Sequence, residues 1–274
     1  MRYDLISQRL LEVIKLEVKS LGTPNCGFNY ALRKWKAVIT NKRCMKFLGS
    51  DFFFEDRLQP FSLFNYVNEV LSLKKIFKFK KAKGLRVLDV GANIGNYGYV
   101  LMKLFPESEV YSFEPNEEPF KYLQVNAVNF SRWNIFNYGV GSTLSEVDFY
   151  FVPEKSGQGS IYKENASLNL LNAKTPVKTT VTLKPLTREF LENNCRGIYF
   201  DFVKIDVEGA ETEVIKGLSN IEWRMMYVEL SNDRGGATKI DDFMVMINET
   251  QPRARVVKSV NNQSVIDLFI LNED

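Results

Sequence analysis

VLDVGANIGNYG, at residues 87–98, joins a strand-like apolar run to a helix-like run through two glycines. The residues before Gly91 have the composition of a buried strand, and those after Gly95 have the composition of a helix. Gly91 and Gly95 allow a tight turn between them, in which main-chain N–H groups at the start of the helix face a ligand. The stretch therefore predicts a strand, a glycine-rich turn and a helix that together bind a nucleotide-like ligand.

The same alternation of strand and helix continues toward the carboxyl terminus, which predicts an α/β fold with a mostly parallel sheet covered on both faces. Residues 254–260 and 264–271 flank the turn-like VNNQ and predict a terminal antiparallel hairpin. The other predicted strands are 86–90, 109–113, 133–140, 146–152, 177–183, 201–207 and 224–230, and the predicted helices are 94–105, 117–130, 211–218 and 238–247.

The first part of the chain, residues 1–83, has a different pattern and is predicted to be a helical extension of a second domain at 84–274. Ile6, Leu10, Val13 and Ile14 have the spacing of one helix face. The aromatic-rich residues 28–79 predict further helices. The lysine-rich residues 74–83 are typical of a solvated helix end, although such a run can also bind phosphates.

The composition excludes several kinds of active site. The chain has 274 residues, 36 Lys and Arg against 33 Asp and Glu, and no histidine. A Ser-His-Asp triad, a histidine-ligated metal and a histidine general base are therefore impossible. The formal net charge of +3 does not call for a polyanionic partner.

The cysteines and the apolar segments indicate a location. Cys26, Cys44 and Cys195 lack the spacing of a metal cluster or a redox pair, which favours a reducing compartment. The amino terminus lacks the pattern of a signal peptide, and no stretch approaches the roughly 20 apolar residues of a membrane span. We expect a soluble cytoplasmic protein that does not bind membranes.

Two carboxylates point to the kind of ligand. Asp89 stands two residues before Gly91, where a negative charge would repel a pyrophosphate but would suit a cationic ligand. Glu114 follows the second strand, where an acidic side chain can accept the hydroxyls of a ribose. The glycine spacing also differs from the G-x-G-x-x-G pattern of dinucleotide sites. These features favour S-adenosylmethionine over a nicotinamide cofactor.

A second group of charged residues lies in FVKIDVEGAE, at residues 202–211. Lys204 and Asp206 are two apart in a strand, so they share a face toward the carboxyl edge of the sheet. With no histidine present, Asp206 or Glu208 is the predicted proton acceptor, and Lys204 is predicted to orient it. The alternatives are a Lys–Asp pair that only neutralises itself, and a Mg²⁺ site that includes Glu229. We predict no metal.

The loop GQGSIY, at residues 157–162, supplies polar groups that can recognise an acceptor. Gln158, Ser160 and Tyr162 are of the kind that hydrogen-bond to sugar hydroxyls, and Glu229 is grouped with them as a substrate-binding candidate. An ordinary surface loop explains the same residues equally well.

Several strings together resemble the FkbM family of S-adenosylmethionine-dependent methyltransferases over residues 86–230. They are DVGANIG, FEP, Asn126, Val140 with Gly141, TLKPL and, most specifically, FVKIDVEGAETEVIKG. The resemblance implies the class I methyltransferase fold, a Rossmann-like sheet, and O-methylation of sugars or of hydroxylated natural products. One departure is Lys184, where the family commonly has an acidic residue.

The resemblance also implies roles for individual residues. The loop from Asp89 to Gly95 would hold the methionine and ribose parts of S-adenosylmethionine, Glu114 the ribose hydroxyls, and residues 137–141 the adenine. The cofactor-binding residues expected on this basis are Asp89, Gly91, Ala92, Asn93, Gly95, Asn96, Glu114, Pro115, Val140 and Asp206.

The expected function is O-methylation of a hydroxyl on a sugar, glycan or similar polyol. Three alternatives remain open at this point. The lysine-rich run motivates a nucleic-acid methyltransferase, although the near-neutral charge makes a nucleic-acid partner less favoured. A nicotinamide-dependent dehydrogenase and a non-catalytic domain of the same fold are the others.

Overall fold

The computed structural model describes residues 43–55, 63, 66–67, 69–70, 84–153, 159–167, 175–231, 240–262 and 265–272. The chain forms two compact units, Met1–Lys80 and Lys81–Asp274. Among the described helices, none is long and apolar enough to cross a membrane.

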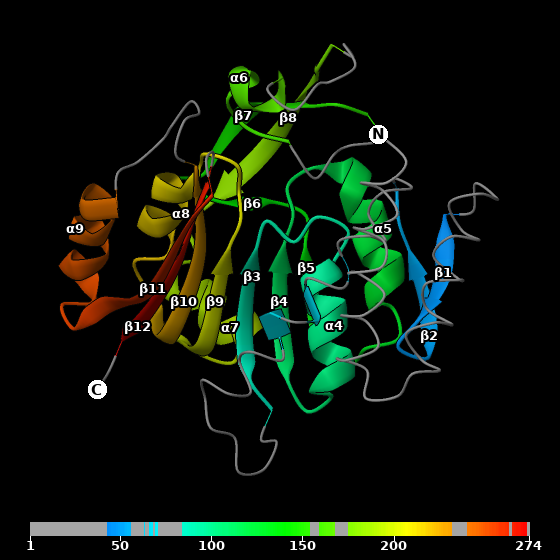
Figure 1. Ribbon diagram of the computed structural model, residues 1–274, viewed down its shortest axis with the longest axis horizontal. Coiled ribbons are helices and arrows are strands. Elements are labelled where there is room, and N and C mark those ends of the chain that lie inside the picture. Colours follow the sequence, from blue (N-terminus) through cyan, green and yellow to red (C-terminus); the bar gives the residue numbers. More distant parts are fainter. Residues whose placement is uncertain are drawn as a thin grey trace, which may run out of the picture. The chain divides into compact units, whose positions relative to one another are not determined.

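A long sheet forms the centre of the second unit (Figure 1). Its strands are β3 (Arg86–Val90), β4 (Glu109–Phe113), β5 (Trp133–Phe136), β9 (Tyr199–Ile205), β10 (Glu222–Ser231), β11 (Ala254–Asn262) and β12 (Val265–Asn272). The spatial order is β11-β12-β10-β9-β3-β4-β5. The pairings from β10 to β5 are parallel, whereas β12 is antiparallel to β10 and to β11. The predicted mostly parallel sheet with a terminal antiparallel hairpin is confirmed.

The order of the strands places a ligand site. The chain passes from β3 to β4 and β5 on one side and then returns to β9 on the other side of β3. Open α/β sheets bind ligands at such a reversal, beyond the carboxyl ends of the strands. The ends of β3 and β9 are therefore the expected position of the functional site.

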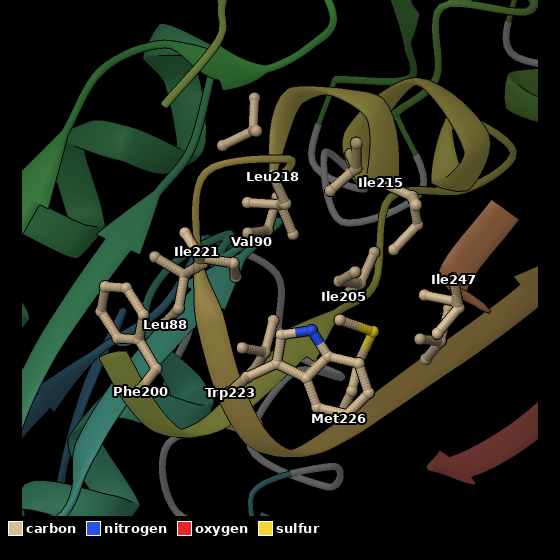
Figure 2. Packing of buried hydrophobic residues seen from close by; sticks show 14 of the residues in the cluster. Leu88, Val90, Phe200, Ile205, Ile215, Leu218, Ile221, Trp223, Met226 and Ile247 are labelled. Carbon is tan, nitrogen blue, oxygen red and sulfur yellow. The ribbon is translucent and has the colours of Figure 1, made fainter. Parts of the chain in front are cut away.

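Helices cover both faces of this sheet. They are α4 (Asn96–Leu104), α5 (Glu117–Ala127), α7 (Arg188–Cys195), α8 (Glu211–Gly217) and α9 (Ile240–Thr250). The main apolar cluster joins α7, α8 and α9 to one face, and Figure 2 shows Ile205, Met226 and Ile247 of this cluster lying together. On the other face, Tyr97 of α4 stacks on Phe202 of β9 with ring centroids 6.0 Å apart.

Helix α5 begins as the sequence predicts. The side chain of Asn116 accepts a hydrogen bond from the main-chain N–H of Glu118, which satisfies one of the unpaired N–H groups of the first turn. Glu117 and Glu118 place negative charge at the same end, where the helix dipole favours it. The helix is therefore held at its start by its own sequence.

A second, smaller sheet lies beyond the carboxyl ends of the central parallel strands (Figure 1). It consists of β6 (Gly139–Val140), β7 (Ser145–Phe151) and β8 (Val177–Lys184), with α6 (Lys163–Ser167) between β7 and β8. The predicted single strand over 133–140 is wrong at its end, because β5 stops at Phe136 and β6 pairs with β8 instead. The cause is a pairing partner more than 40 residues away, which the local pattern cannot reveal.

The described part of the first unit contains a β-hairpin. Strands β1 (Cys44–Phe47) and β2 (Ser50–Phe53) pair antiparallel. Leu48 and Gly49 join them, with φ of 44° and 86°. Positive φ at both central residues is the geometry of a type I′ turn, whose twist matches that of the strands. The prediction of helices throughout 28–79 is therefore wrong for residues 44–53, whereas residues 63, 66–67 and 69–70 are helical.

An alternating pattern explains this hairpin. Met45, Phe47 and Phe52 are buried, and between them Lys46 and Asp51 face each other across the strands with a 3.2 Å contact. A period of two is the signature of a half-buried strand, and aromatic richness concealed it in the sequence.

Several predicted features lie outside the described residues. They are the helix around Ile6 to Ile14, the lysine-rich run at 74–83, Cys26 and Gln158. Of the other two cysteines, Cys44 is partly buried, Cys195 is fully buried, and neither forms a disulfide.

Candidate active site

A row of polar side chains crosses the face of the sheet that α4 covers. Ser112 of β4, Asp89 of β3 and Lys204 of β9 are direct neighbours in the strand register. The Ser112 hydroxyl donates to Asp89 Oδ2 over 3.0 Å and accepts from the Trp133 indole N–H over 2.9 Å. The register thus brings together residues from three strands that are far apart in the sequence.

Asp89 and Lys204 form a buried charge pair in this row. Their side chains are 0% and 3% exposed, and Asp89 Oδ1 lies 4.0 Å from Lys204 Nζ. Burial raises the pKa of Asp89, while the Lys204 charge and the Ser112 hydrogen bond oppose that rise. The Lys204 ammonium also lies 5.8 Å from the centre of the Tyr97 ring. Lys204 is therefore placed to hold negative charge on the carboxylates at this edge.

Lys204 also contacts Asp206, as the sequence predicts. Lys204 Nζ and Asp206 Oδ2 are 2.9 Å apart, and the Asp206 side chain is 26% exposed. Asp206 follows the last residue of β9, and its main-chain N–H donates to Val90 O at the end of β3. One ammonium group thus joins the buried Asp89 to the more accessible Asp206.

The glycine-rich turn after β3 uses its main-chain N–H groups within the protein. The amides of Gly91 and Ala92 donate to Phe113 O, and that of Asn93 donates to Glu114 Oε2. The amide of Ile94 is bonded to the Asn93 side chain, and that of Gly95 to Ala92 O. The five amides of the turn are thus occupied within the protein, whereas the amides expected to face a ligand are those at the start of the helix, which begins at Asn96. The turn consequently lacks the amide cradle that binds a pyrophosphate.

The two glycines are required by contacts within the protein. A Cβ on Gly91 would lie 1.9 Å from the main-chain oxygen of Asp206, and one on Gly95 would lie 2.7 Å from Leu123. Both residues have positive φ, 81° and 85°, which favours glycine. Gly91 therefore lets β3 and β9 end in direct contact, which sets Asp206 beside the turn.

Glu114 is buried at the end of β4. Its Oε2 and Oε1 accept the amides of Asn93 and Asn116, both over 2.8 Å. Burial raises the pKa of Glu114 to about 7, although these two hydrogen bonds lower it. The Asn137 side chain donates to the main-chain oxygen of Glu114 over 3.0 Å. Each carboxylate oxygen keeps a second lone pair, so Glu114 can still accept ribose hydroxyls.

Buried polar atoms near this turn fit a ligand. In the described part of the chain, Asp89 Oδ1 and Asn96 Oδ1 are buried and accept no hydrogen bond. Buried polar atoms normally find a partner, so a ligand with donor groups or positive charge would complete them. Ala92 is buried and Pro115 partly buried in the same region. The Asp89 and Asn96 oxygens therefore fit a ligand such as S-adenosylmethionine.

Val140 is placed differently from the other expected cofactor residues. It belongs to the small sheet, and its side chain is part of the main apolar cluster at 3% exposure. The expected adenine border at 137–141 remains a proposal. The hydrogen bond from Asn137 keeps that segment next to the end of β4.

Three carboxylates meet where β9 ends beside Glu229 of β10. One oxygen each from Asp206, Glu208 and Glu229 lies within 4.8 Å of the other two. The negative charge of Asp206 raises the pKa of Glu229 to about 9, together with burial and the charge of Glu208. Such a group of acids can share a proton or hold a divalent cation. The structure brings together the three acids that the sequence analysis selected.

Two polar residues beside this cluster were not predicted from the sequence. Tyr227 OH donates to Asp267 Oδ1 over 2.8 Å, and Asp267 of β12 stands directly opposite Glu229 of β10. Asp267 is the one acidic residue in SVIDLFIL, as Asp89 is in RVLDV. A lone acid in an apolar strand is the signal that could have identified it.

The candidate acceptor-binding residues have different environments. Ser160 is fully buried, and its hydroxyl donates to Glu208 O and accepts from the Tyr162 amide. Tyr162 and Glu229 are partly buried. The Ser160 side chain is therefore engaged with the Glu208 turn.

Comparisons with known proteins identify a family and several relatives. The methyltransferase FkbM domain family matches residues 89–253. Methyltransferase 1 of Beauveria bassiana (strain ARSEF 2860) is 26% identical over 164 residues, which are 54% of this chain and 66% of that protein. Hexuronic acid methyltransferase AglP of Haloferax volcanii is 26% identical over 171 residues, which are 62% and 64% of the two chains.

One further relative and one solved structure are also similar to this chain. The 2-O-methyltransferase NoeI of Sinorhizobium fredii is 24% identical over 156 residues, 53% of this chain and 63% of that protein. The crystal structure of methyltransferase FkbM from Methylobacillus flagellatus KT superposes with a TM-score of 0.48 at 14% identity, covering 87% of this chain and 59% of that one. The chain thus spans less than two thirds of the length of these relatives.

The family match covers more than half of the chain and includes every residue of the polar row and of the acid cluster, whereas Asp267 lies outside the match. It makes the matched region a methyltransferase domain whose methyl donor is S-adenosylmethionine. The chain belongs to the methyltransferase FkbM domain family.

Proposed function

We propose that the chain is an O-methyltransferase that methylates a hydroxyl of a sugar, a glycan or a similar polyol. The observation that carries the proposal is the group of Asp206, Glu208 and Glu229 beside the Asp89–Lys204 pair. Relatives named as a hexuronic acid methyltransferase and a 2-O-methyltransferase support the choice of a sugar acceptor.

The residues of the glycine-rich turn would hold the cofactor. Asp89 and Glu114 supply two carboxylates at the ends of β3 and β4, and residues 137–141 would border the adenine. When bound, S-adenosylmethionine supplies an electrophilic methyl group on a positively charged sulfur. The Lys204 charge opposes the rise that burial causes in the pKa of Asp89.

The acid cluster would remove the acceptor proton. A sugar hydroxyl stays neutral near pH 7, so its proton must leave as the oxygen forms its new bond. Asp206 Oδ or Glu208 Oε accepts that proton, and Lys204 fixes Asp206 through the 2.9 Å contact. Positioning of the acceptor contributes further, about 7–11 kcal/mol in well-aligned reactions.

The test is transfer of labelled methyl from S-adenosylmethionine by the purified full chain to a panel of free sugars, uronic acids and glycans. RNA and DNA form the second arm of the panel. Methyl incorporation into a saccharide hydroxyl, mapped by mass spectrometry, is the expected result. Incorporation into nucleic acid alone, or into no acceptor, would contradict the proposal.

The same assay tests for a metal. One oxygen from each of the three carboxylates lies within 4.8 Å of the other two, so the group could hold a divalent cation. The assay is therefore repeated in excess chelator. We expect full activity in chelator. Loss of activity that Mg²⁺ restores would assign the cluster to a metal instead.

A further inference from the structure

Two side chains from outside the central sheet hold the main chain of Glu208. Ser160 Oγ donates to Glu208 O over 2.7 Å, and Asn165 Nδ2 donates to the same oxygen over 2.8 Å. Ser160 and Asn165 are 0% and 1% exposed. A single carbonyl is thus held by two buried donors that are more than 40 residues away in the sequence.

The turn that they hold has an unusual backbone. Glu208 has a φ of 52° and Gly209 a φ of 105°. The left-handed conformation is unfavourable for a residue with a Cβ, so it persists only where the surroundings enforce it. The amide of Gly209 donates to the buried carboxylate of Glu211, which supports the turn from the α8 side. Ser160 and Asn165 supply the support from the opposite direction.

The two donors are themselves fixed. Ser160 and Tyr150 exchange main-chain hydrogen bonds of 2.9 and 2.8 Å, which attach the segment to β7. The Ser160 hydroxyl also accepts the Tyr162 amide over 3.0 Å, and the Asn165 amide donates to Tyr162 O over 3.1 Å. Both donors are uncharged, so they add no net charge to the acid cluster.

We propose that Ser160 and Asn165 are positioning residues that hold the Glu208 turn so that the Glu208 carboxylate stays beside Asp206 and Glu229. Residues 160–165, between β7 and β8, thereby set the geometry of the acid cluster. This inference rests on the proposed function for its kinetic consequence, because Glu208 is one of the two candidate proton acceptors.

The kinetic test uses Ser160→Ala, Asn165→Ala and a matched serine control. Ser142→Ala removes a 2.7 Å hydrogen bond to Glu213, which also reaches α8 but does not touch Glu208. We expect Ser160→Ala and Asn165→Ala to lower kcat by about 10- to 100-fold, the cost of a displacement near 1 Å, with the cofactor Kd unchanged. Ser142→Ala should keep wild-type kcat.

A double-mutant cycle separates positioning from general damage. In a Glu208→Gln background, Ser160→Ala should have almost no further effect on kcat, because both changes act through the same carboxylate. Equal losses in both backgrounds would overturn the proposal. Wild-type kcat in Ser160→Ala and Asn165→Ala, or in Glu208→Gln itself, would also overturn it.

Hydrogen–deuterium exchange tests the positioning without any acceptor. The peptide spanning residues 203–212 should exchange faster in Ser160→Ala and in Asn165→Ala than in wild type, and Ser142→Ala should match wild type. Unchanged exchange in both variants would overturn the proposal. If the wild-type chain methylated no acceptor while exchange rose as expected, the proposed function would fail and the positioning of Glu208 would stand.

Discussion

Negative charge is concentrated at one edge of the sheet, and Lys204 is the group that balances it. Asp206 lies 2.9 Å from the Lys204 ammonium and is partly exposed, whereas Asp89 is fully buried 4.0 Å away on the other side. Glu208 and Glu229 add two more carboxylates near Asp206. Under the proposed function, the partly exposed Asp206 would meet the acceptor and the buried Asp89 would face the cationic cofactor.

Substitution of the candidate proton acceptors is the direct residue-level prediction. At least one of Asp206→Asn and Glu208→Gln should lower kcat by about 10²- to 10⁴-fold, the usual contribution of a general base. Cofactor binding, measured by calorimetry, should persist in the variant that loses turnover. Glu146→Gln, at an exposed position on β7, is the control. Wild-type turnover in both site variants would exclude this role for the two acids.

The protonation of Glu229 predicts a pH dependence of stability. Its pKa rises from 4.5 to about 9 because of the Asp206 charge, burial and the Glu208 charge. Between these two values the folded chain keeps a proton that the unfolded chain has released. The contribution of Glu229 to stability therefore falls as pH rises through this window.

Glu229→Gln removes this titration while nearly preserving the side-chain shape. The Tm of Glu229→Gln relative to wild type should increase steadily from pH 5 to pH 9. Thermal unfolding followed by circular dichroism measures it in the absence of cofactor. A Tm difference that stays constant with pH would show that Glu229 is not held protonated.

At the scale of elements, the contact between the turn after β3 and the end of β9 positions the site. Gly91 lets the two main chains meet, and the Asp206 amide then bonds to Val90 O. The same turn satisfies its own amides through Phe113 O and Glu114. Three strand ends are thus joined by main-chain hydrogen bonds before any ligand is bound.

Gly91→Ala should disrupt this junction. A Cβ there would lie 1.9 Å from Asp206 O, whereas a Cβ on Gly197, which also has positive φ, would lie 3.8 Å from its nearest neighbour. Both variants incur backbone strain, but only Gly91→Ala adds a clash with main chain. We expect Gly91→Ala to lower the free energy of unfolding by about 1–3 kcal/mol more than Gly197→Ala. Urea denaturation measures both, and equal losses would argue against the contact.

Element boundaries follow the sequence closely where the pattern is local. The predicted 86–90 and 109–113 agree with β3 and β4, since each is a short apolar run between turn residues. Helix α7 was not predicted, although Thr187 caps it by accepting the Phe190 amide. The helix is short and polar on average, and its buried residues are Leu191 and Cys195, so few apolar residues marked it in the sequence.

At the scale of the whole molecule, S-adenosylhomocysteine, the product of the cofactor, should stabilise the second unit against unfolding. A ligand that binds only the folded chain raises stability by about 2.7 kcal/mol at a hundredfold excess over its Kd. S-adenosylhomocysteine should therefore raise the Tm progressively with concentration, and NAD should not. Asp89→Asn should weaken the shift, because it removes the buried charge beside Lys204. A shift with NAD alone would contradict the assigned cofactor.

The candidate site was partly visible in the sequence for a simple reason. Asp89, Lys204 and Glu229 are charged residues inside apolar strands, and such residues are rarely buried without a partner or a function. Asp267 has the same signature but was overlooked. Ser112 carries no such signal, because a serine in a strand attracts notice only when its neighbour across the sheet is known.

Local composition and periodicity were enough to identify the α/β fold, the glycine-rich turn and the acids of the site, because these depend on residues adjacent in the chain. The pairing of β6 with β8, the use of the turn amides within the protein and the two donors on Glu208 O became evident only in the folded molecule. Each of these contacts joins groups that are distant in the sequence. The contacts depend on strand register and on the position of the small sheet beyond the carboxyl ends of the central strands.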